Sequence, residues 1–148
     1  VLIIDTGTVF DGYFCDFDRN FGFGQIADDT HRANAAVHQA LDAGFVAAHP
    51  GVRMCEVWAA MWQVLEDHGA LGNSIGRMGH GLGMLLTEWP SIHPDDQNVL
   101  EPGVVITLEP GMIFAPGRQL VHEENIVITE NGAQYLTRRA PPEIPVIR

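Results

Sequence analysis

The stretches VLIIDTG at residues 1–7 and YFCDFDRN at residues 13–20 decide the fold class of this chain. Both are apolar runs that carry aspartates, and Asp11 and Gly12 lie between them. An Asp-Gly pair between two apolar runs is a strong signal for a β-hairpin, because both residues accept the positive φ angles of a two-residue turn. We therefore predict an antiparallel hairpin at the start of the sequence.

The register of this hairpin brings acidic residues together. With a two-residue turn, Gly7 faces Asp16 and Asp5 faces Asp18, and all four positions lie on one face of the ribbon. Asp5 and Asp16 are then diagonal neighbours, about 7–8 Å apart at the backbone. Carboxylates that gather in this way repel one another unless a cation lies among them. This segment alone leaves two interpretations open, a metal site and a solvated hairpin face.

The composition argues against several classes of protein. The chain has 148 residues, of which 46% are hydrophobic, enough for a sizeable core and too many for a disordered protein. The net charge of −11 argues against binding to a nucleic-acid backbone or an anionic membrane. The two cysteines lack CxxC spacing, which predicts reduced thiols and a cytoplasmic location. No stretch is long and apolar enough to span a membrane.

Two segments show helical periodicity. Residues 27–48 place small and apolar side chains at three- and four-residue spacing, and residues 53–68 do the same with methionine, tryptophan and leucine. We predict two helices that bury these faces. His31 and His38 lie off the buried face of the first helix, so we expect both to be solvated.

After the second helix the sequence changes to strands and loops. His80 lies among glycines in residues 79–83, the apolar run at residues 104–108 ends on Glu109, and residues 121–128 form an apolar strand that carries acids. Any one of these polar residues would ordinarily be a surface or structural residue. Their recurrence at strand ends beside Gly or Pro favours a shared functional site.

Five segments together resemble the ligand motifs of the pita-bread metallopeptidases, the family of methionine aminopeptidase, Xaa-Pro aminopeptidase and prolidase. They occur in the family order and comprise Asp5-Thr6-Gly7, Asp16-Phe17-Asp18, Gly79-His80-Gly81, Thr107-Leu108-Glu109-Pro110-Gly111 and Glu123-Glu124-Asn125. The resemblance implies an α+β pita-bread fold, a curved antiparallel sheet with helices on one side. It also implies five metal ligands, which are Asp5, Asp16, His80, Glu109 and Glu123. By the same resemblance, Glu109 and His80 have catalytic roles as well.

The chemistry of this ligand set supports two divalent ions. Four carboxylates and one neutral imidazole carry four negative charges, which two divalent ions neutralise. The resemblance implies that Asp16 and Glu123 bridge the ions, that Asp5 binds one of them, and that His80 and Glu109 bind the other. Oxygen-rich ligation points toward manganese, iron or cobalt, with zinc as a further candidate. Such a pair of ions activates a water for attack on a polarised carbonyl, with Glu109 relaying a proton.

Two positions near the ligands differ from the family pattern. Thr87 stands where the family's peptidases have a second His that helps to hold the scissile carbonyl. His93, in the loop that follows, is an alternative donor. Asp18 stands where the family usually has a small hydroxyl residue, and we do not assign it as a ligand.

A third difference concerns the segment before Glu123, and a fourth the start of the sequence. Val121 stands where Xaa-Pro aminopeptidases often have Arg, and strand alternation turns His122 away from the face of Glu123. The family also has a helical and β half before its first ligand. The resemblance therefore implies that residues 1–148 are the C-terminal portion of a catalytic pita-bread domain.

The predicted function is that of a dinuclear metal-dependent hydrolase that resembles Xaa-Pro peptidases. It would cleave a C–N bond in a small peptide or amide substrate. Two alternatives stay open: a metal-dependent lyase or amidohydrolase that acts on a small metabolite, and a metal-free pseudo-enzyme that binds peptides. We expect a cytoplasmic homodimer when the protein is full length, with neither nucleic acid nor a membrane as partner.

Overall fold

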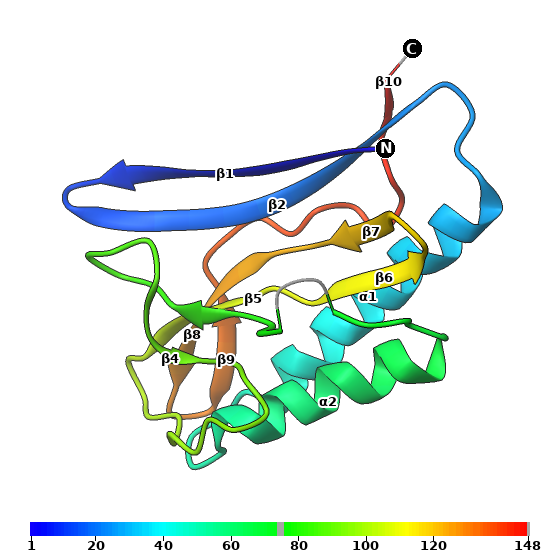
Figure 1. Cartoon of the computed structure of the whole chain (residues 1–148). Coiled ribbons are helices and arrows are strands. Elements are labelled where there is room, and N and C mark those ends of the chain that lie inside the picture. The colour runs from blue at the N-terminus through cyan, green and yellow to red at the C-terminus, as the bar shows by residue number, and fades with distance from the viewer. Residues whose placement is uncertain (74–75, 148) are drawn as a thin grey trace.

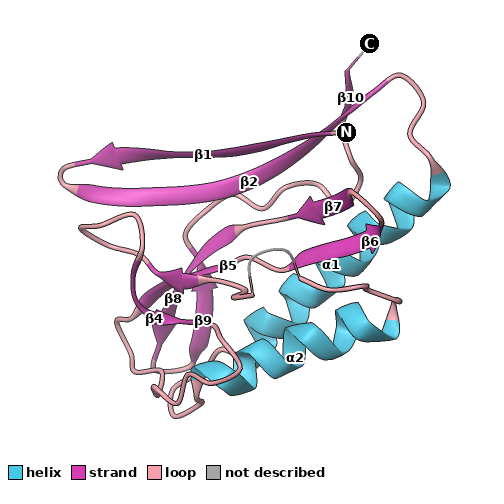
Figure 2. Cartoon of the chain, in the orientation of Figure 1, coloured by secondary structure: helices cyan, strands magenta, loops and turns pink. Residues whose placement is uncertain are grey.

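The structure, a computed structural model, describes residues 1–73 and 76–147. The described part is an α+β fold in which a long hairpin lies on one side, shorter strands lie in the middle, and two helices lie on the other side (Figure 1, Figure 2). The helices are α1 (Asp28–Ala47) and α2 (Met54–Asp67). The strands are β1 (Leu2–Phe10), β2 (Tyr13–Phe23), β3 (His80–Gly81), β4 (Glu88–Ser91), β5 (Val105–Leu108), β6 (Gly111–Ala115), β7 (Arg118–Val121), β8 (Glu124–Thr129), β9 (Gly132–Tyr135) and β10 (Val146–Ile147).

The described strands form three sheets, and the five-stranded sheet lies below the hairpin (Figure 1). Five strands are ordered β4-β3-β5-β8-β9, while β6 pairs with β7, and β10 extends the hairpin beside β2. Neighbours are antiparallel except for β10, which runs parallel to β2. Because β3, β5 and β8 are neighbours, residues that are far apart in the sequence come to one place below the hairpin.

The predicted hairpin and its register are confirmed. Asp11 and Gly12 form the turn with φ angles of 55° and 87°, which suit the two-residue turn expected from Asp-Gly. Gly7 pairs with Asp16, and Asp5 pairs with Asp18. Along β2 the buried face is polar, so the hairpin presents carboxylates rather than apolar side chains to the strands below it.

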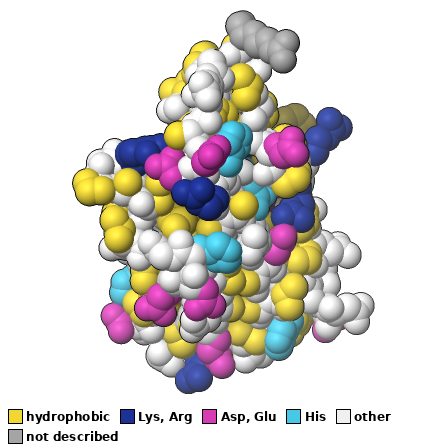
Figure 3. Space-filling view, turned by 90° about the vertical axis from the view of Figure 1, so that its right-hand side faces the viewer, with side chains coloured by type: hydrophobic (Ala, Val, Ile, Leu, Met, Phe, Trp, Pro, Cys, Tyr) yellow, Lys and Arg dark blue, Asp and Glu magenta, His cyan; other side chains and the backbone are white. Residues whose placement is uncertain are grey.

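The two predicted helices are also confirmed, each to within one residue at both ends. They pack against each other and against the middle strands through the faces that the periodicity indicated. The fully or almost fully buried helix residues are Ala33, Ala36, Val37, Ala40, Leu41, Met54, Val57, Met61 and Leu65. Neither helix is long and apolar enough to cross a membrane. The face shown in Figure 3 carries acidic, basic and histidine side chains that are interspersed with one another.

The prediction that His38 is solvated is wrong, whereas His31 is exposed as expected. Only 8% of the His38 surface is accessible, because its ring stacks on that of His122 with the centroids 4.3 Å apart. The C-terminal segment covers the same side of α1, where Asn34 Nδ2 donates a hydrogen bond of 2.8 Å to the backbone oxygen of Pro142. Helical periodicity reveals the face toward the main core but not a second cover of this kind.

The predicted single strand at residues 121–128 is in fact two strands. β7 ends at Val121 and β8 begins at Glu124, with His122 and Glu123 between them. β7 pairs with β6, whereas β8 pairs with β5, so the chain passes from one sheet to the other at this point. The interruption places Glu123 at the junction of the sheets, below the hairpin.

Candidate metal centre

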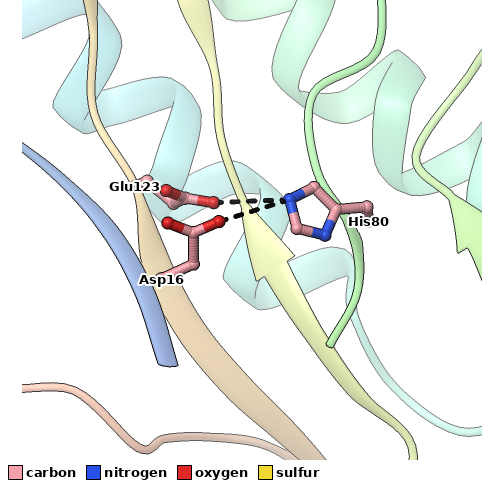
Figure 4. Close-up of side chains that lie close together, drawn as sticks. All are labelled: Asp16, His80 and Glu123. Carbon is pink, nitrogen blue, oxygen red and sulfur yellow. Dashed lines mark ion pairs between the residues drawn. The ribbon is translucent and has the colours of Figure 1, made fainter. Parts of the chain in front are cut away.

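Three side chains from distant parts of the chain converge between the hairpin and the five-stranded sheet (Figure 4). Asp16 comes from β2, His80 from β3, and Glu123 from the junction of β7 and β8. His80 Nε2 lies 3.8 Å from Asp16 Oδ2 and 3.8 Å from Glu123 Oε1. Two atoms that each bind one ion at about 2.0–2.2 Å lie at most about 4.4 Å apart. The spacing therefore suits one ion held among the three side chains.

His80 presents the lone pair of Nε2 to these carboxylates. Its Nδ1 lies 2.9 Å from the backbone oxygen of Gly81, which can only accept a hydrogen bond. Nδ1 therefore carries the proton, and Nε2 is available to a metal. At Gly79 φ is 139°, and a Cβ there would lie 2.1 Å from the backbone oxygen of Thr107. Glycine is thus needed for β3 to approach β5 closely enough to deliver His80 to the site.

A second group of possible ligand atoms adjoins the first. It consists of Asp5, Asp18 and Glu123, whose carboxylate atoms lie within 4.8 Å of one another. Asp18 is only 4% accessible, whereas Asp5 is exposed on the hairpin. Glu123 belongs to both groups, as a residue shared by two ions would. Asp18 was not assigned from the sequence, although the alternation of the hairpin places it on the same face.

Glu109 is the one predicted ligand that the structure brings into neither group of described residues. It follows β5 directly, and its backbone nitrogen donates a hydrogen bond of 2.8 Å to the oxygen of Met78, beside β3. Its side chain is buried, and its charge acts on that of Glu123. Glu109 therefore lies next to the centre, with its carboxylate outside ligand spacing.

Burial controls the protonation of these groups in the absence of a cation. Burial, followed by the charge of Glu109, raises the pKa of Glu123 to about 9. Burial also raises the pKa values of Asp18 and Glu109 to about 7, with further contributions from Asp5 on the former and Asp18 on the latter. For His80, burial lowers the pKa and favours the neutral imidazole that a metal requires. The acids of the centre outnumber the arginines that act on them, Arg19 and Arg77, and divalent cations would balance the remaining negative charge.

Three buried carboxylate oxygens at this centre have no hydrogen-bond partner. They are Asp18 Oδ1, Glu109 Oε2 and Glu123 Oε1. Most buried polar atoms in proteins are satisfied, so an unpartnered group calls for a specific explanation such as a role in binding an ion. The donor set, oxygen with one imidazole, suits manganese, iron, cobalt or zinc. The residues present therefore fit divalent ions.

Side-chain amides fasten the hairpin over this centre. Asn125 in β8 accepts a hydrogen bond of 3.3 Å from the backbone nitrogen of Asp16 and donates one to the backbone oxygen of the same residue. Further along β2, Asn20 Nδ2 donates a hydrogen bond of 2.8 Å to the oxygen of Val121. These contacts hold β2 against both strands that flank Glu123. Sequence reasoning did not assign either asparagine a role, although both occur within or beside the acidic segments.

The structure also locates the positions that differ from the family pattern. Thr87 is exposed at the end of the loop between β3 and β4, and His93 is half-buried just beyond β4. His122 turns away from Glu123, as alternation predicted, and its Nε2 lies 3.3 Å from a carboxylate oxygen of Glu124. Val121 is buried.

Residues 1–130 match metallopeptidase family M24. The chain belongs to this family. Its curated relatives include the Xaa-Pro dipeptidase of Pyrococcus furiosus, which is 31% identical over 93% of this chain and 40% of the relative. The probable dipeptidase PepE of Mycobacterium bovis is 34% identical over 99% of this chain and 39% of the relative.

Solved structures of M24 proteins share the fold. An X-Pro aminopeptidase from Thermotoga maritima MSB8 superposes with a TM-score of 0.90 at 27% identity, over 98% of this chain and 41% of the other. The α+β pita-bread fold predicted from the motifs is therefore confirmed for this M24 chain. The chain spans about 40% of the length of the curated relatives named above.

Proposed function

We propose that this M24 chain carries the dinuclear metal centre of a peptidase that cleaves Xaa-Pro bonds in small peptides. The observation that carries the proposal is a group of buried acids whose oxygens lack partners, beside an imidazole whose Nε2 is available to a metal. Membership of M24 and the relatives named as dipeptidases support the peptide substrate. The whole protein's activity is part of the proposal.

The ligand set follows the five motif positions. Asp16 and Glu123 would hold both ions, Asp5 would hold one, and His80 would hold the other. Glu109, whose buried carboxylate lies next to the centre, would join His80 when the ion is bound. Asp18 lies within ligand spacing of Asp5 and Glu123 on the hairpin side. Two divalent ions, when bound, polarise a carbonyl and lower the pKa of a water molecule.

The side chains of this centre contribute orientation and proton transfer. Asn125 keeps β2, and with it Asp16, at a fixed distance from β8. The Gly81 oxygen keeps His80 in the tautomer that leaves Nε2 unprotonated. Glu109, buried with Oε2 unpartnered, accepts a proton from the attacking water and returns it to the leaving nitrogen.

Metal analysis combined with a peptide assay tests the proposal. The full-length protein is stripped with a chelator, reloaded with manganese, and assayed on Ala-Pro. We expect two ions per chain and hydrolysis only in the loaded protein. Asp16→Asn should lose both ions and activity, whereas Glu130→Gln, which changes an exposed acid away from the centre, should keep both.

Two results would contradict this function. Full metal content in Asp16→Asn would remove the ligand assignment. Two bound ions without hydrolysis of any dipeptide or small amide would favour the metal-dependent lyase instead, whereas a protein that binds no metal would favour the pseudo-enzyme. A homodimer, a cytoplasmic location and manganese as the natural metal stay predictions, which sedimentation, fractionation and analysis of native protein would check.

A further inference from the structure

One arginine beside the metal centre has no partner for its charge. Arg77 is half-buried, its Nε is fully buried without a hydrogen bond, and its side chain makes no ion pair with any described residue. By contrast, four other arginines form ion pairs with acids, and these are Arg19, Arg53, Arg118 and Arg139. A partly buried guanidinium without a partner is unfavourable. The guanidinium of Arg77 is therefore available to bind an anion.

Arg77 lines a pocket of about 360 Å³ beside β3 and β4. Trp89 and Ser91 of β4, and His93 just beyond it, also line the pocket. Ser91 pairs with His80 across the β3–β4 ladder. The pocket therefore adjoins the strand that carries the His80 imidazole.

The charges around the pocket leave Arg77 free to bind a ligand. Asp96 is buried, and its carboxylate accepts hydrogen bonds from the backbone nitrogens of Ser91 at 3.0 Å and Asn98 at 2.8 Å. Asp95 is exposed and lies 3.7 Å from Nδ1 of His93. Neither acid is paired with the guanidinium. Arg77 instead acts electrostatically on Asp16, His80 and Glu109, which places its charge within range of the metal centre.

We infer that this pocket is a subsite for a carboxylate group of the substrate, with Arg77 as the residue that recognises it. The inference rests on the proposed peptidase function, since it names a part of the substrate bound beside the same centre. A guanidinium offers two parallel N–H donors that match the two oxygens of a carboxylate. Ser91 and His93 can donate further hydrogen bonds, and Trp89 forms the apolar wall.

A carboxylate this close to the reacting bond has two possible sources in a small peptide. One is the free C-terminus of a dipeptide, and the other is an acidic side chain. In either case the guanidinium of Arg77 offers the carboxylate a partner of opposite charge. Arg77 would therefore set specificity through binding rather than through the chemical step.

The test compares acids with matched amides on the manganese-loaded protein. Hydrolysis is measured for Ala-Pro against Ala-Pro amide, and for Glu-Pro amide against Gln-Pro amide. Binding of N-acetylproline and N-acetylprolinamide is measured by calorimetry, which requires no turnover. We expect the wild type to prefer the acid in at least one pair, and Arg77→Met to weaken that preference by roughly tenfold to a hundredfold, mainly in KM.

The controls separate the anion subsite from stability and from the proposed function. Arg138→Met removes the charge of an exposed arginine that forms no ion pair with any described residue, and it should leave the acid preference unchanged. Arg77→Lys keeps the charge but loses the paired donors, so it should give an intermediate preference even if Arg77→Met folds poorly. Loss of preference for Ala-Pro identifies the C-terminus, and loss for Glu-Pro amide identifies the side chain.

The inference is overturned if the wild type binds no acid better than its amide, or if both Arg77 variants retain the full preference. Arg77-dependent binding of N-acetylproline without hydrolysis of any peptide would support the subsite while contradicting the peptidase function. The two conclusions therefore fail in different ways.

Discussion

Glu123 and Glu124 are consecutive and both buried, but their pKa values shift in opposite directions. Glu123 faces the metal centre, where burial and neighbouring acids raise its pKa to about 9 and Oε1 has no partner. For Glu124, burial also raises the pKa, but hydrogen bonds from His122, Thr137 and the Ala140 backbone, together with the charge of Arg19, outweigh it and bring the value to about 2. The comparison teaches that burial alone does not distinguish a functional acid from a structural one; the partners do.

The partners of Glu124 form a closed network on the reverse face of β8. Arg19 Nη2 donates a hydrogen bond of 3.1 Å to one carboxylate oxygen, and the backbone nitrogen of Ala140 donates one of 2.9 Å to the other. Thr137 donates a further hydrogen bond from its hydroxyl. The network ties β2, β8 and the C-terminal segment together. A folded protein supplies positive charge to Glu124 itself, whereas Glu123 needs an external cation.

Glu123→Gln should have the largest effect on function. Losing a carboxylate shared by two ions removes several kcal/mol of electrostatic stabilisation, so kcat/KM on Ala-Pro should fall by roughly a thousandfold or more. The metal-free protein should be no less stable than the wild type, because the substitution removes an acid that is repelled by its neighbours. Metal analysis and thermal melting in chelator check both parts; retention of two ions would contradict the role of Glu123.

Glu124→Gln should show the reverse behaviour. The amide cannot neutralise Arg19, and the hydrogen bonds to a charged acceptor are weakened, so the free energy of unfolding should fall by about 2–3 kcal/mol. Folded protein should still bind two ions. Urea denaturation gives the first quantity and metal analysis the second. A variant that keeps its stability but loses metal would show that Glu124 serves the centre directly.

The pH dependence of stability should separate the two faces. In the metal-free protein Glu123 holds its proton more tightly when folded, so its stabilising contribution is full below about pH 4.5 and is lost as the pH rises toward about 9. Glu124 has a lowered pKa, so its contribution is full above about pH 4.5 and is lost as the pH falls toward about 2. Bound metal should abolish the loss of stability at high pH but not the loss at low pH. Unfolding midpoints with chelator and with manganese, from pH 3 to pH 9, would show it; equal slopes in both conditions would count against a metal at Glu123.

Thr87→His should have the smallest effect of the four, and a favourable one. An imidazole at this exposed loop position can donate to the substrate carbonyl as negative charge develops, which the shorter Thr87 side chain does poorly. We expect kcat/KM on Ala-Pro to rise by about tenfold, while metal content and stability stay unchanged. Wild-type turnover comparable with ordinary prolidases, together with a loss in the variant, would show that His93 or another donor already fills this role.

Local patterns in the sequence determined the hairpin, both helices and the direction of several side chains. The Asp-Gly turn fixes which residues of β1 and β2 face one another, because alternation has a period of two and the loop has only two residues. From this the pairing of Asp5 with Asp18 and of Gly7 with Asp16 follows directly. The same alternation correctly separates His122 from Glu123. Spacing of three and four residues likewise determines the main buried faces of α1 and α2.

Only the tertiary structure decided which side chains acquire partners from distant segments. His38 is buried by His122, which is 84 residues away, and Glu124 is neutralised by Arg19, which lies 105 residues before it. Contacts between distant segments also determine the break between β7 and β8 and the approach of Asp18 to Glu123. They likewise leave Arg77 without an ion pair to any described residue. Periodicity reports which face of an element is apolar, but the partner of a polar side chain depends on chain segments that only folding brings together. For that reason the sequence could identify the acidic residues only as one group. The fold divides them into acids that have hydrogen-bond or ion-pair partners within the protein and acids whose partner would be a bound ligand.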